Sequence, residues 1–199
     1  MKMLRLAGFA LVLGMVAAPL PAQQMASDGE AFIKAVREAN GAKATELLNA
    51  RGSTVVNYRG YDGDNALHVV TRRRDGDWLA FMLSKRADPN VGNKTGDTPL
   101  LIASRIGFTE GARTLLAFGA KVDLANKLGE TPLIVAVQQR QPQTVRLLLE
   151  SGANPDKADH AAGYSARDYA KRDRRSGELL RLIESVKSTR KAAVGPTIK

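Results

Sequence analysis

The chain has 199 residues, no cysteine and a formal net charge of +10 at neutral pH. The lack of cysteine excludes disulfide bonds and thiolate metal sites, and the two histidines, His68 and His160, stand far apart in the chain with no metalloprotease motif around them. We therefore expect a basic protein that holds no metal ion and no cofactor.

Residues 1–22 have the layout of a secretory signal peptide. Lys2 and Arg5 precede an apolar run over residues 6–18, and the sequence P-L-P-A then ends at Ala22. A membrane anchor is the alternative, but this run is short against the roughly 20 residues that a spanning helix needs. We expect cleavage after Ala22, export to a bacterial periplasm, and no transmembrane segment in the mature chain.

Behind the signal, residues 23–29 (Q-Q-M-A-S-D-G) are mostly polar and are predicted to form a leader outside the fold. Cleavage would leave residues 23–199, a length that suits a single domain. It would also remove Lys2 and Arg5, so that the formal charge falls from +10 to +8.

A similar sequence motif recurs along the middle of the chain at a regular interval. The sequence G-D-T-P-L-L-I-A begins at Gly96, and G-E-T-P-L-I-V-A begins at Gly129, which defines a 33-residue period. One period before Gly96 stands Gly63 in G-D-N-A-L-H-V-V, and one period plus one residue after Gly129 stands Gly163 in G-Y-S-A-R-D-Y-A. A fixed period of this length is the sequence signature of stacked structural repeats.

Each copy carries the signals of two short helices. Thr98 and Thr131 precede a proline, which predicts a capped helix start, and Asn65 and Ser165 occupy the same place in the outer copies. The second helix of each copy is predicted from apolar residues at i, i+3 and i+4, which share one helical face. These triplets are Ala44/Leu47/Leu48, Leu79/Met82/Leu83, Ala112/Leu115/Leu116, Val145/Leu148/Leu149 and Leu179/Leu182/Ile183. Because one short helix pair cannot bury its apolar face alone, the copies must stack.

The 33-residue spacing, the T-P-L core and the G-A-x-x-D/N ending resemble ankyrin repeats over residues 30–185. The resemblance implies an all-α repeat fold, an ankyrin solenoid of stacked helix pairs with short β-hairpin or turn connections. We predict a degenerate first helix pair, three full repeats and a closing helix pair. Their boundaries are 30–59, 60–92, 93–125, 126–159 and 160–185.

The end of the chain is strongly basic. From Ala166 to Lys199 there are ten Lys and Arg against four Asp and Glu, a net +6. Residues 186–199 show no apolar periodicity and are predicted to be a basic flexible tail.

In ankyrin repeats the partner usually meets the hairpin tips and the exposed side of the first helices, which line a concave groove. The resemblance therefore implies a protein-binding role for the residues in those slots, which also include the acidic residues Asp64, Asp97 and Glu130. The predicted contact residues are Tyr61, Asp62, Arg72, Arg73, Lys94, Arg105, Ile106, Lys127, Leu128, Gln138, Gln139 and Arg172. For the arginines, the alternative is an ordinary solvated surface.

Two motifs resemble sites of chemistry but lack a required residue. Residues 163–167 place Arg167 where a nucleophile elbow needs its second glycine, and residues 92–96 lack the residue order of a P-loop. His68 occupies the slot of the histidine in the T-P-L-H text of ankyrin repeats, which implies a structural hydrogen bond rather than catalysis.

The sequence favours an exported, monomeric scaffold that binds an unknown protein and has no intrinsic catalysis. The alternative is an electrostatic binder of an anionic envelope polymer, a lipid or nucleic acid through the basic C-terminal segment. Nucleic acid is the least favoured ligand, because no aromatic residues alternate with the basic ones. An enzyme would need a site assembled across repeats that no spacing reveals.

Overall fold

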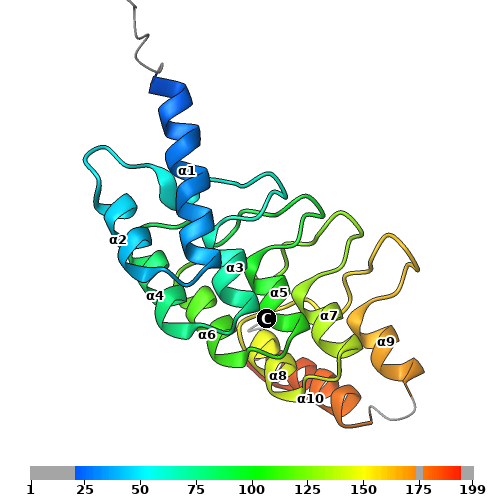
Figure 1. The fold of residues 1–199 in the computed structure, drawn as a ribbon. Coiled ribbons are helices and arrows are strands. Elements are labelled where there is room, and N and C mark those ends of the chain that lie inside the picture. The colour runs from blue at the N-terminus through cyan, green and yellow to red at the C-terminus, as the bar shows by residue number, and fades with distance from the viewer. Residues whose placement is uncertain (1–20, 174–176, 194–199) are drawn as a thin grey trace, which may run out of the picture.

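The protein is a row of helix pairs with long loops projecting along one side (Figure 1). This computed structural model describes residues 21–173 and 177–193, with side chains over 28–173 and 177–185. The predicted signal peptide, apart from Pro21 and Ala22, lies outside the described residues.

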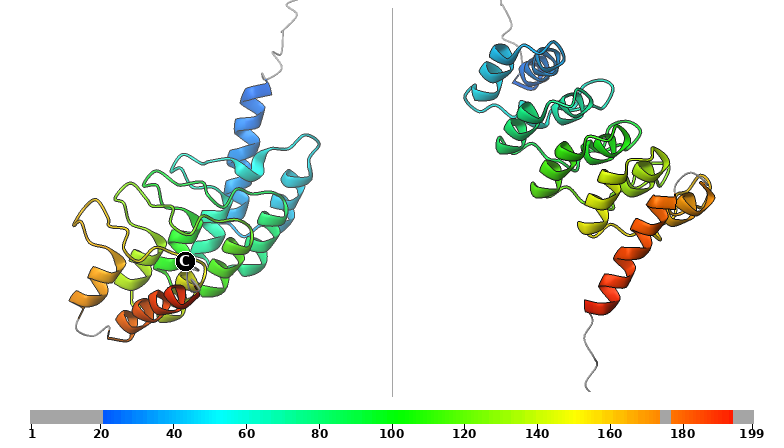
Figure 2. Two further views of the ribbon diagram at one scale, coloured as in Figure 1. Left: turned by 180° about the vertical axis from the view of Figure 1, so that it is seen from behind. Right: turned by 90° about the horizontal axis from the view of Figure 1, so that it is seen from below.

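The described residues form ten α-helices and one short 3-10 helix, η1. The helix bounds are α1 Pro21–Arg37, α2 Gly41–Asn49, η1 Val55–Asn57, α3 Ala66–Arg72, α4 Gly76–Ser84, α5 Pro99–Arg105, α6 Thr109–Ala117, α7 Pro132–Gln138, α8 Pro142–Glu150, α9 Ala166–Arg172 and α10 Gly177–Ala193. The helices stand in two rows (Figure 2). The inner row packs α1, α3, α5, α7 and α9 against one another in that order, and the outer row packs α4, α6, α8 and α10. This is the all-α repeat solenoid that the sequence predicts.

The four repeated glycines occupy equivalent places in four loops. Gly63, Gly96, Gly129 and Gly163 all have a positive φ, between +69° and +83°. The loops also pack closely: a Cβ on Gly129 would lie 2.6 Å from the backbone nitrogen of His160, so glycine is required there. The predicted period is therefore confirmed in three dimensions.

Each of these loops is closed by the same backbone hydrogen bond. The N–H of residues 60, 93, 126 and 159 donates to the carbonyl of residues 64, 97, 130 and 164, respectively. The last loop is one residue longer, as the sequence spacing predicts. The connections are turns without assigned strands in the described part of the chain, where the sole β-bridge joins Ala158 and Ser165.

The predicted helix starts are confirmed. The Thr98 hydroxyl accepts a hydrogen bond from the Leu101 N–H, and Thr131 caps α7 in the same way, each followed by proline. The side chains of Asn65 and Ser165 cap α3 and α9. These caps fix where each inner helix leaves its loop, and so where its side chains point.

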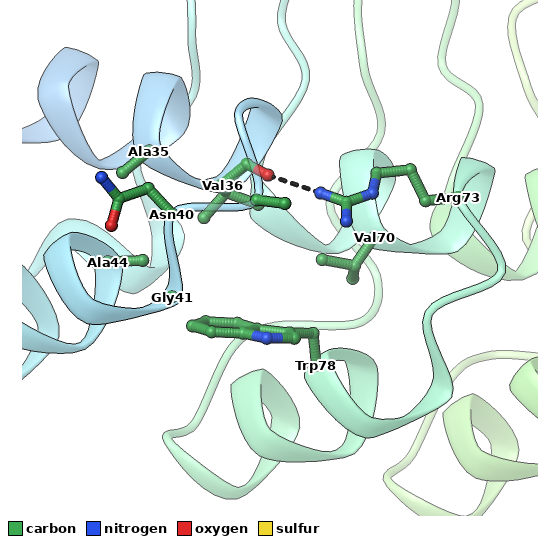
Figure 3. Close-up of a pocket in the computed structure, with 9 residues that line it drawn as sticks. Ala35, Val36, Asn40, Gly41, Ala44, Val70, Arg73 and Trp78 are labelled. Carbon is green, nitrogen blue, oxygen red and sulfur yellow. Dashed lines mark hydrogen bonds between the residues drawn. The ribbon is translucent and has the colours of Figure 1, made fainter.

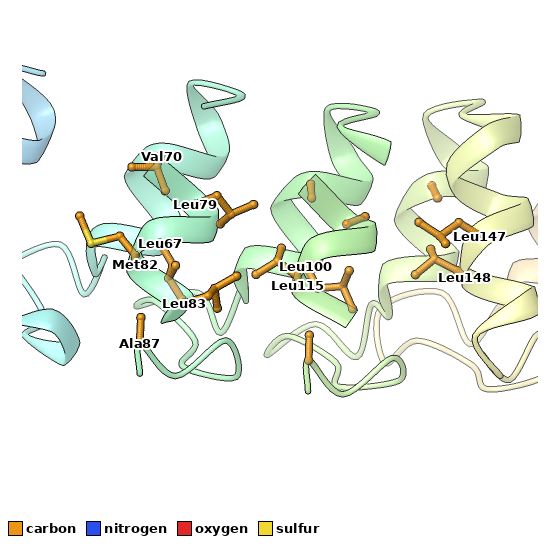
Figure 4. Close-up of a cluster of buried hydrophobic side chains, with 14 of the residues drawn as sticks. Leu67, Val70, Leu79, Met82, Leu83, Ala87, Leu100, Leu115, Leu147 and Leu148 are labelled. Atoms are coloured by element: carbon orange, nitrogen blue, oxygen red, sulfur yellow. The ribbon is translucent and has the colours of Figure 1, made fainter. Parts of the chain in front are cut away.

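The apolar triplets of the outer helices form the core between the rows (Figure 4). Leu79, Met82, Leu115 and Leu148 have no exposed surface, and they belong to one continuous cluster with residues of the inner helices. The interior therefore runs through the stack instead of dividing into separate repeats, as the need to stack predicts.

Two predicted boundaries differ from the structure. Residues 23–29, predicted as a leader, belong to α1, and residues 186–193 of the predicted flexible tail belong to α10. Residues 23–29 include two Gln and one Ala, and residues 186–193 include two Lys, one Arg and two Ala, which are residue types that favour helix. Extending an existing helix also costs less than starting one. Their polarity was a poor guide to where the helices end.

Among residues 21–173 and 177–193, no helix combines the length and the apolar character that crossing a membrane requires.

Candidate protein-binding face

The loops and the inner helices meet on one side of the stack. We call this the hairpin face, which consists of the loops 60–64, 93–97, 126–130 and 159–164 and the C-terminal ends of α3, α5, α7 and α9. Two ion pairs show that loop and helix end are in contact. Arg72 at the end of α3 binds Asp64, and Arg105 at the end of α5 binds Asp97 with a shortest N–O distance of 2.6 Å.

In both pairs the carboxylate lies beneath the arginine. The side chains of Asp64 and Asp97 are only 8% and 11% exposed, whereas those of Arg72 and Arg105 are 45% and 38% exposed. Arg72 and Arg105 are therefore held by internal partners, but their side chains still reach the surface.

Side-chain amides extend these pairs from one repeat to the next. Asn93 donates to Asp64 at 3.1 Å, and Asn126 donates to Asp97 at 2.9 Å and to Glu130 at 2.8 Å. A polar ladder thus crosses three consecutive loops and fixes their relative positions.

The two buried aspartates remain ionised at neutral pH. Burial by itself would raise their pKa values, but hydrogen bonds from Arg72 and Arg105 and from the amides outweigh it, so that the pKa of Asp64 and of Asp97 is lowered. The negative charge on this part of the face is internal and already compensated.

Several predicted contact residues are exposed at the loop tips. Tyr61 is 87% exposed, and the Lys94 ammonium lies 4.6 Å from the centre of its ring. Lys127 is exposed, and Leu128 beside it is 56% exposed. Asp62 pairs with Arg37 at the end of α1, at 2.5 Å.

A second cation–aromatic pair lies at the other end of the stack. The Arg172 guanidinium lies 4.4 Å from the centre of the Tyr164 ring, and Tyr164 meets Tyr169 edge to face. Arg172 and Gln138 line a shallow hollow between α7 and α9, and Gln139 beside it is exposed.

Two predicted contact residues are engaged within the stack. Arg73 reaches toward α1 and donates to the carbonyl of Val36 at 2.9 Å (Figure 3). Ile106 caps the end of α5 and is half-buried. Arg73 thus joins α3 to α1, and contact of either residue with a partner stays a prediction.

The acidic partners of the arginines are what the sequence reasoning missed. Asp64 and Asp97 stand in the predicted tip slots, yet their pairing with the helix ends was not foreseen. The signal exists in the sequence, because an acidic residue precedes an arginine by eight positions in two successive repeats, at 64 and 72 and at 97 and 105. Such a recurring offset indicates a contact made within each repeat.

His68 has the structural role that the sequence implies. The side chain is fully buried, its Nδ1 accepts from the Asn65 N–H at 3.1 Å, and its Nε2 lies 2.9 Å from the carbonyl oxygen of Asp97. Burial lowers the pKa of His68, so the ring is neutral, with the proton on Nε2 donated to that carbonyl. The histidine ties one repeat to the next loop.

The described residues include no group of three or more His, Asp or Glu side chains placed to hold a metal ion. The hairpin face presents exposed cations, two exposed apolar side chains and polar side chains hydrogen-bonded between repeats.

Residues 67–159 match the family model for ankyrin repeats, in three copies. Comparison with the curated proteins finds no match.

Proposed function

Since this chain is an ankyrin repeat protein, we propose that it binds a protein partner through the hairpin face, with no catalysis of its own. Ankyrin repeats generally mediate protein–protein interaction. The observation that supports this face is the placement of apolar surface. Of the three large hydrophobic side chains exposed in the described residues, Tyr61 and Leu128 both lie at loop tips.

The hydrogen bonds between neighbouring loops support the same proposal. The backbone N–H of Lys127 donates to Thr95 at 3.0 Å, and that of His160 donates to Leu128 at 2.8 Å, so neighbouring tips are joined. A face that is ordered before binding loses little conformational entropy on association, which favours affinity. Tyrosine and arginine are also among the side chains that most often anchor interfaces.

A photocrosslinking residue at position 128 tests the proposal, with position 118 as the matched control. Leu128 and Phe118 are both exposed apolar residues, but Phe118 follows the outer helix α6. We expect crosslinking at position 128 to capture a protein in the native host and crosslinking at 118 to capture none. Capture from position 118 alone would place the interface on the outer face and refute the proposal.

We further propose that the scaffold acts after export to a periplasm, on the strength of the N-terminal signal layout. Fractionation of the host followed by N-terminal sequencing tests this. A mature protein that begins at Gln23 in the exported fraction is the expected result. A chain that keeps residues 1–22 in the cytoplasmic fraction would contradict it.

A second candidate function is binding of an anionic envelope polymer, a lipid or nucleic acid through the basic C-terminal segment. It is supported by the net +6 over residues 166–199. Such binding should weaken steeply as salt rises and should disappear when residues 186–199 are deleted. Binding that survives the deletion would assign the ligand to another part of the protein.

A further inference from the structure

We infer that the segment bound by the hairpin face is acidic and carries apolar side chains between its carboxylates. This inference rests on the proposed function and specifies the chemistry of the partner. It follows from which charges the face exposes and which it buries.

The exposed charges at the centre of the face are positive. Lys94 and Lys127 stand at successive loop tips and are exposed. The side chains of Arg72 and Arg105, at the ends of the inner helices α3 and α5, are 45% and 38% exposed. Arg172 adds a further exposed cation at the far end.

Most negative charges of the same region are covered, and the exception is Asp62, which is 42% exposed and paired with Arg37. Asp64 and Asp97 are almost fully covered, and the Glu130 side chain is 20% exposed, beside Arg105 at 3.7 Å. A partner that approaches the face therefore meets ammonium and guanidinium groups first. Because the aspartates already hold the arginines in place, a carboxylate of the partner can bind them without first ordering their side chains.

The apolar side chains stand next to these cations. Tyr61 lies against Lys94, and Leu128 follows Lys127 in the chain. A ligand that satisfied only the charges would leave both apolar side chains in water. The face thus fits a protein segment in which Asp or Glu residues are interspersed with Leu, Ile or aromatic residues.

Two other occupants fit less well. A second copy of this chain has the same sign of charge, with a formal +10, so like charges would oppose self-association. A single-stranded nucleic acid would need a series of exposed rings on which bases stack. Of the tyrosines at the described loops of the face, Tyr61 is exposed beside Lys94, whereas Tyr164 is partly covered beneath Arg172.

The test measures fluorescence anisotropy of labelled twelve-residue peptides on the purified protein. The acidic probe repeats Glu-Leu-Asp-Phe, and the control probe replaces each acidic residue with lysine. We expect the acidic probe to bind with an affinity that falls as salt rises, whereas the lysine probe stays unbound. Equal binding of both peptides, or tighter binding of an oligothymidylate, would overturn the inference.

Charge-reversal variants show where on the protein the acidic probe binds. The double variant Lys94→Glu/Lys127→Glu should bind the acidic probe roughly tenfold or more weakly, since like charges then face each other. The matched control is Arg113→Glu/Arg146→Glu, which reverses two arginines at a hollow between the outer helices α6 and α8. This control should keep the affinity within about twofold. Equal losses in both variants would mean a general effect of net charge and would refute the site.

Thermal unfolding of both double variants shows whether each remains folded, and Leu128→Ser provides a second test that leaves charge unchanged. Leu128→Ser should lower the affinity for the acidic probe. An unchanged affinity would refute the part of the inference that assigns apolar side chains to the partner. The two proposals fail separately. If position 128 crosslinks to a partner through a neutral or basic segment, protein binding by the face stands and the acidic specificity is refuted.

Discussion

The carboxylate of Asp97 lies buried beneath the guanidinium group of Arg105, with Nη1 2.6 Å from Oδ2. The same carboxylate accepts from Asn126 of the next loop at 2.9 Å. One buried charge therefore joins a helix end, its own loop and the neighbouring repeat. The pair shapes the surface, since it orients an arginine that a partner can reach, and it also stabilises the stack.

Replacing Arg105 with alanine should lower the free energy of unfolding by about 1–2 kcal/mol, because the covered carboxylate of Asp97 loses its cationic partner. The expected loss is small because the side chain of Arg105 is partly exposed to solvent. Urea unfolding measures the change. The control is Arg113→Ala, whose pair with Glu110 is exposed on both sides and should matter by less than about 0.5 kcal/mol. Equal losses would show that the Asp97 pair is no more stabilising than a surface contact.

Structural features that depend only on neighbouring residues were predictable from the sequence. The cap at Thr98 and the turn at Gly96 each depend on residues within a few positions, and the repeat period copies them along the chain. Contacts between segments were harder to foresee. That Arg73 would bond to the carbonyl of Val36, 37 residues earlier, depends on how two helices pack. The extent of α1 and α10 was missed because polar residues can extend a helix that apolar residues have already started.

Replacing Thr98 with alanine should cost about 1 kcal/mol, because the Leu101 N–H at the start of α5 loses its acceptor. The proline that follows fixes the backbone but supplies no acceptor. Urea unfolding gives the value, and Thr54→Ala is the matched control. Thr54 precedes η1 without a side-chain capping bond, so its loss should change stability by less than about 0.5 kcal/mol. A smaller effect at Thr98 than at Thr54 would argue against the cap.

Replacing Arg86 with glycine should stabilise the protein. Arg86 follows α4 with φ at +66°, in the slot where Gly119 and Gly152 follow α6 and α8. A left-handed conformation is unfavourable for a residue with a Cβ, and glycine removes that strain at some cost in chain entropy. We expect a net gain of about 0.5 kcal/mol.

The control for this prediction is Ala80→Gly, an exposed position within the same helix α4. There glycine relieves no strain and should cost about 1 kcal/mol. Thermal unfolding of the two variants side by side should give shifts of opposite sign. If Arg86→Gly lowers the melting temperature as Ala80→Gly does, the turn is not strained.

Stability should fall as the pH drops below about 6.5, the ordinary pKa of histidine in an unfolded chain. Burial lowers the pKa of His68 in the native state, so below that pH the unfolded chain takes up a proton that the folded one resists. The stabilisation is therefore complete above a pH of about 6.5 and is lost toward the lower native pKa, by up to about 1.4 kcal/mol per pH unit. Asp64 and Asp97 stay ionised in this range, because their pKa values are lowered.

Urea unfolding at pH 7.5 and pH 5.5 measures this loss, and the two histidines supply the comparison. His160 is exposed at a loop tip, so His160→Ala should keep the full pH dependence. His68→Asn should lower stability at pH 7.5, because the hydrogen bond to the Asp97 carbonyl is lost, and should flatten the dependence between the two pH values. A pH dependence that follows His160 instead would mean that the buried ring between the first two full repeats does not set the acid stability of the stack.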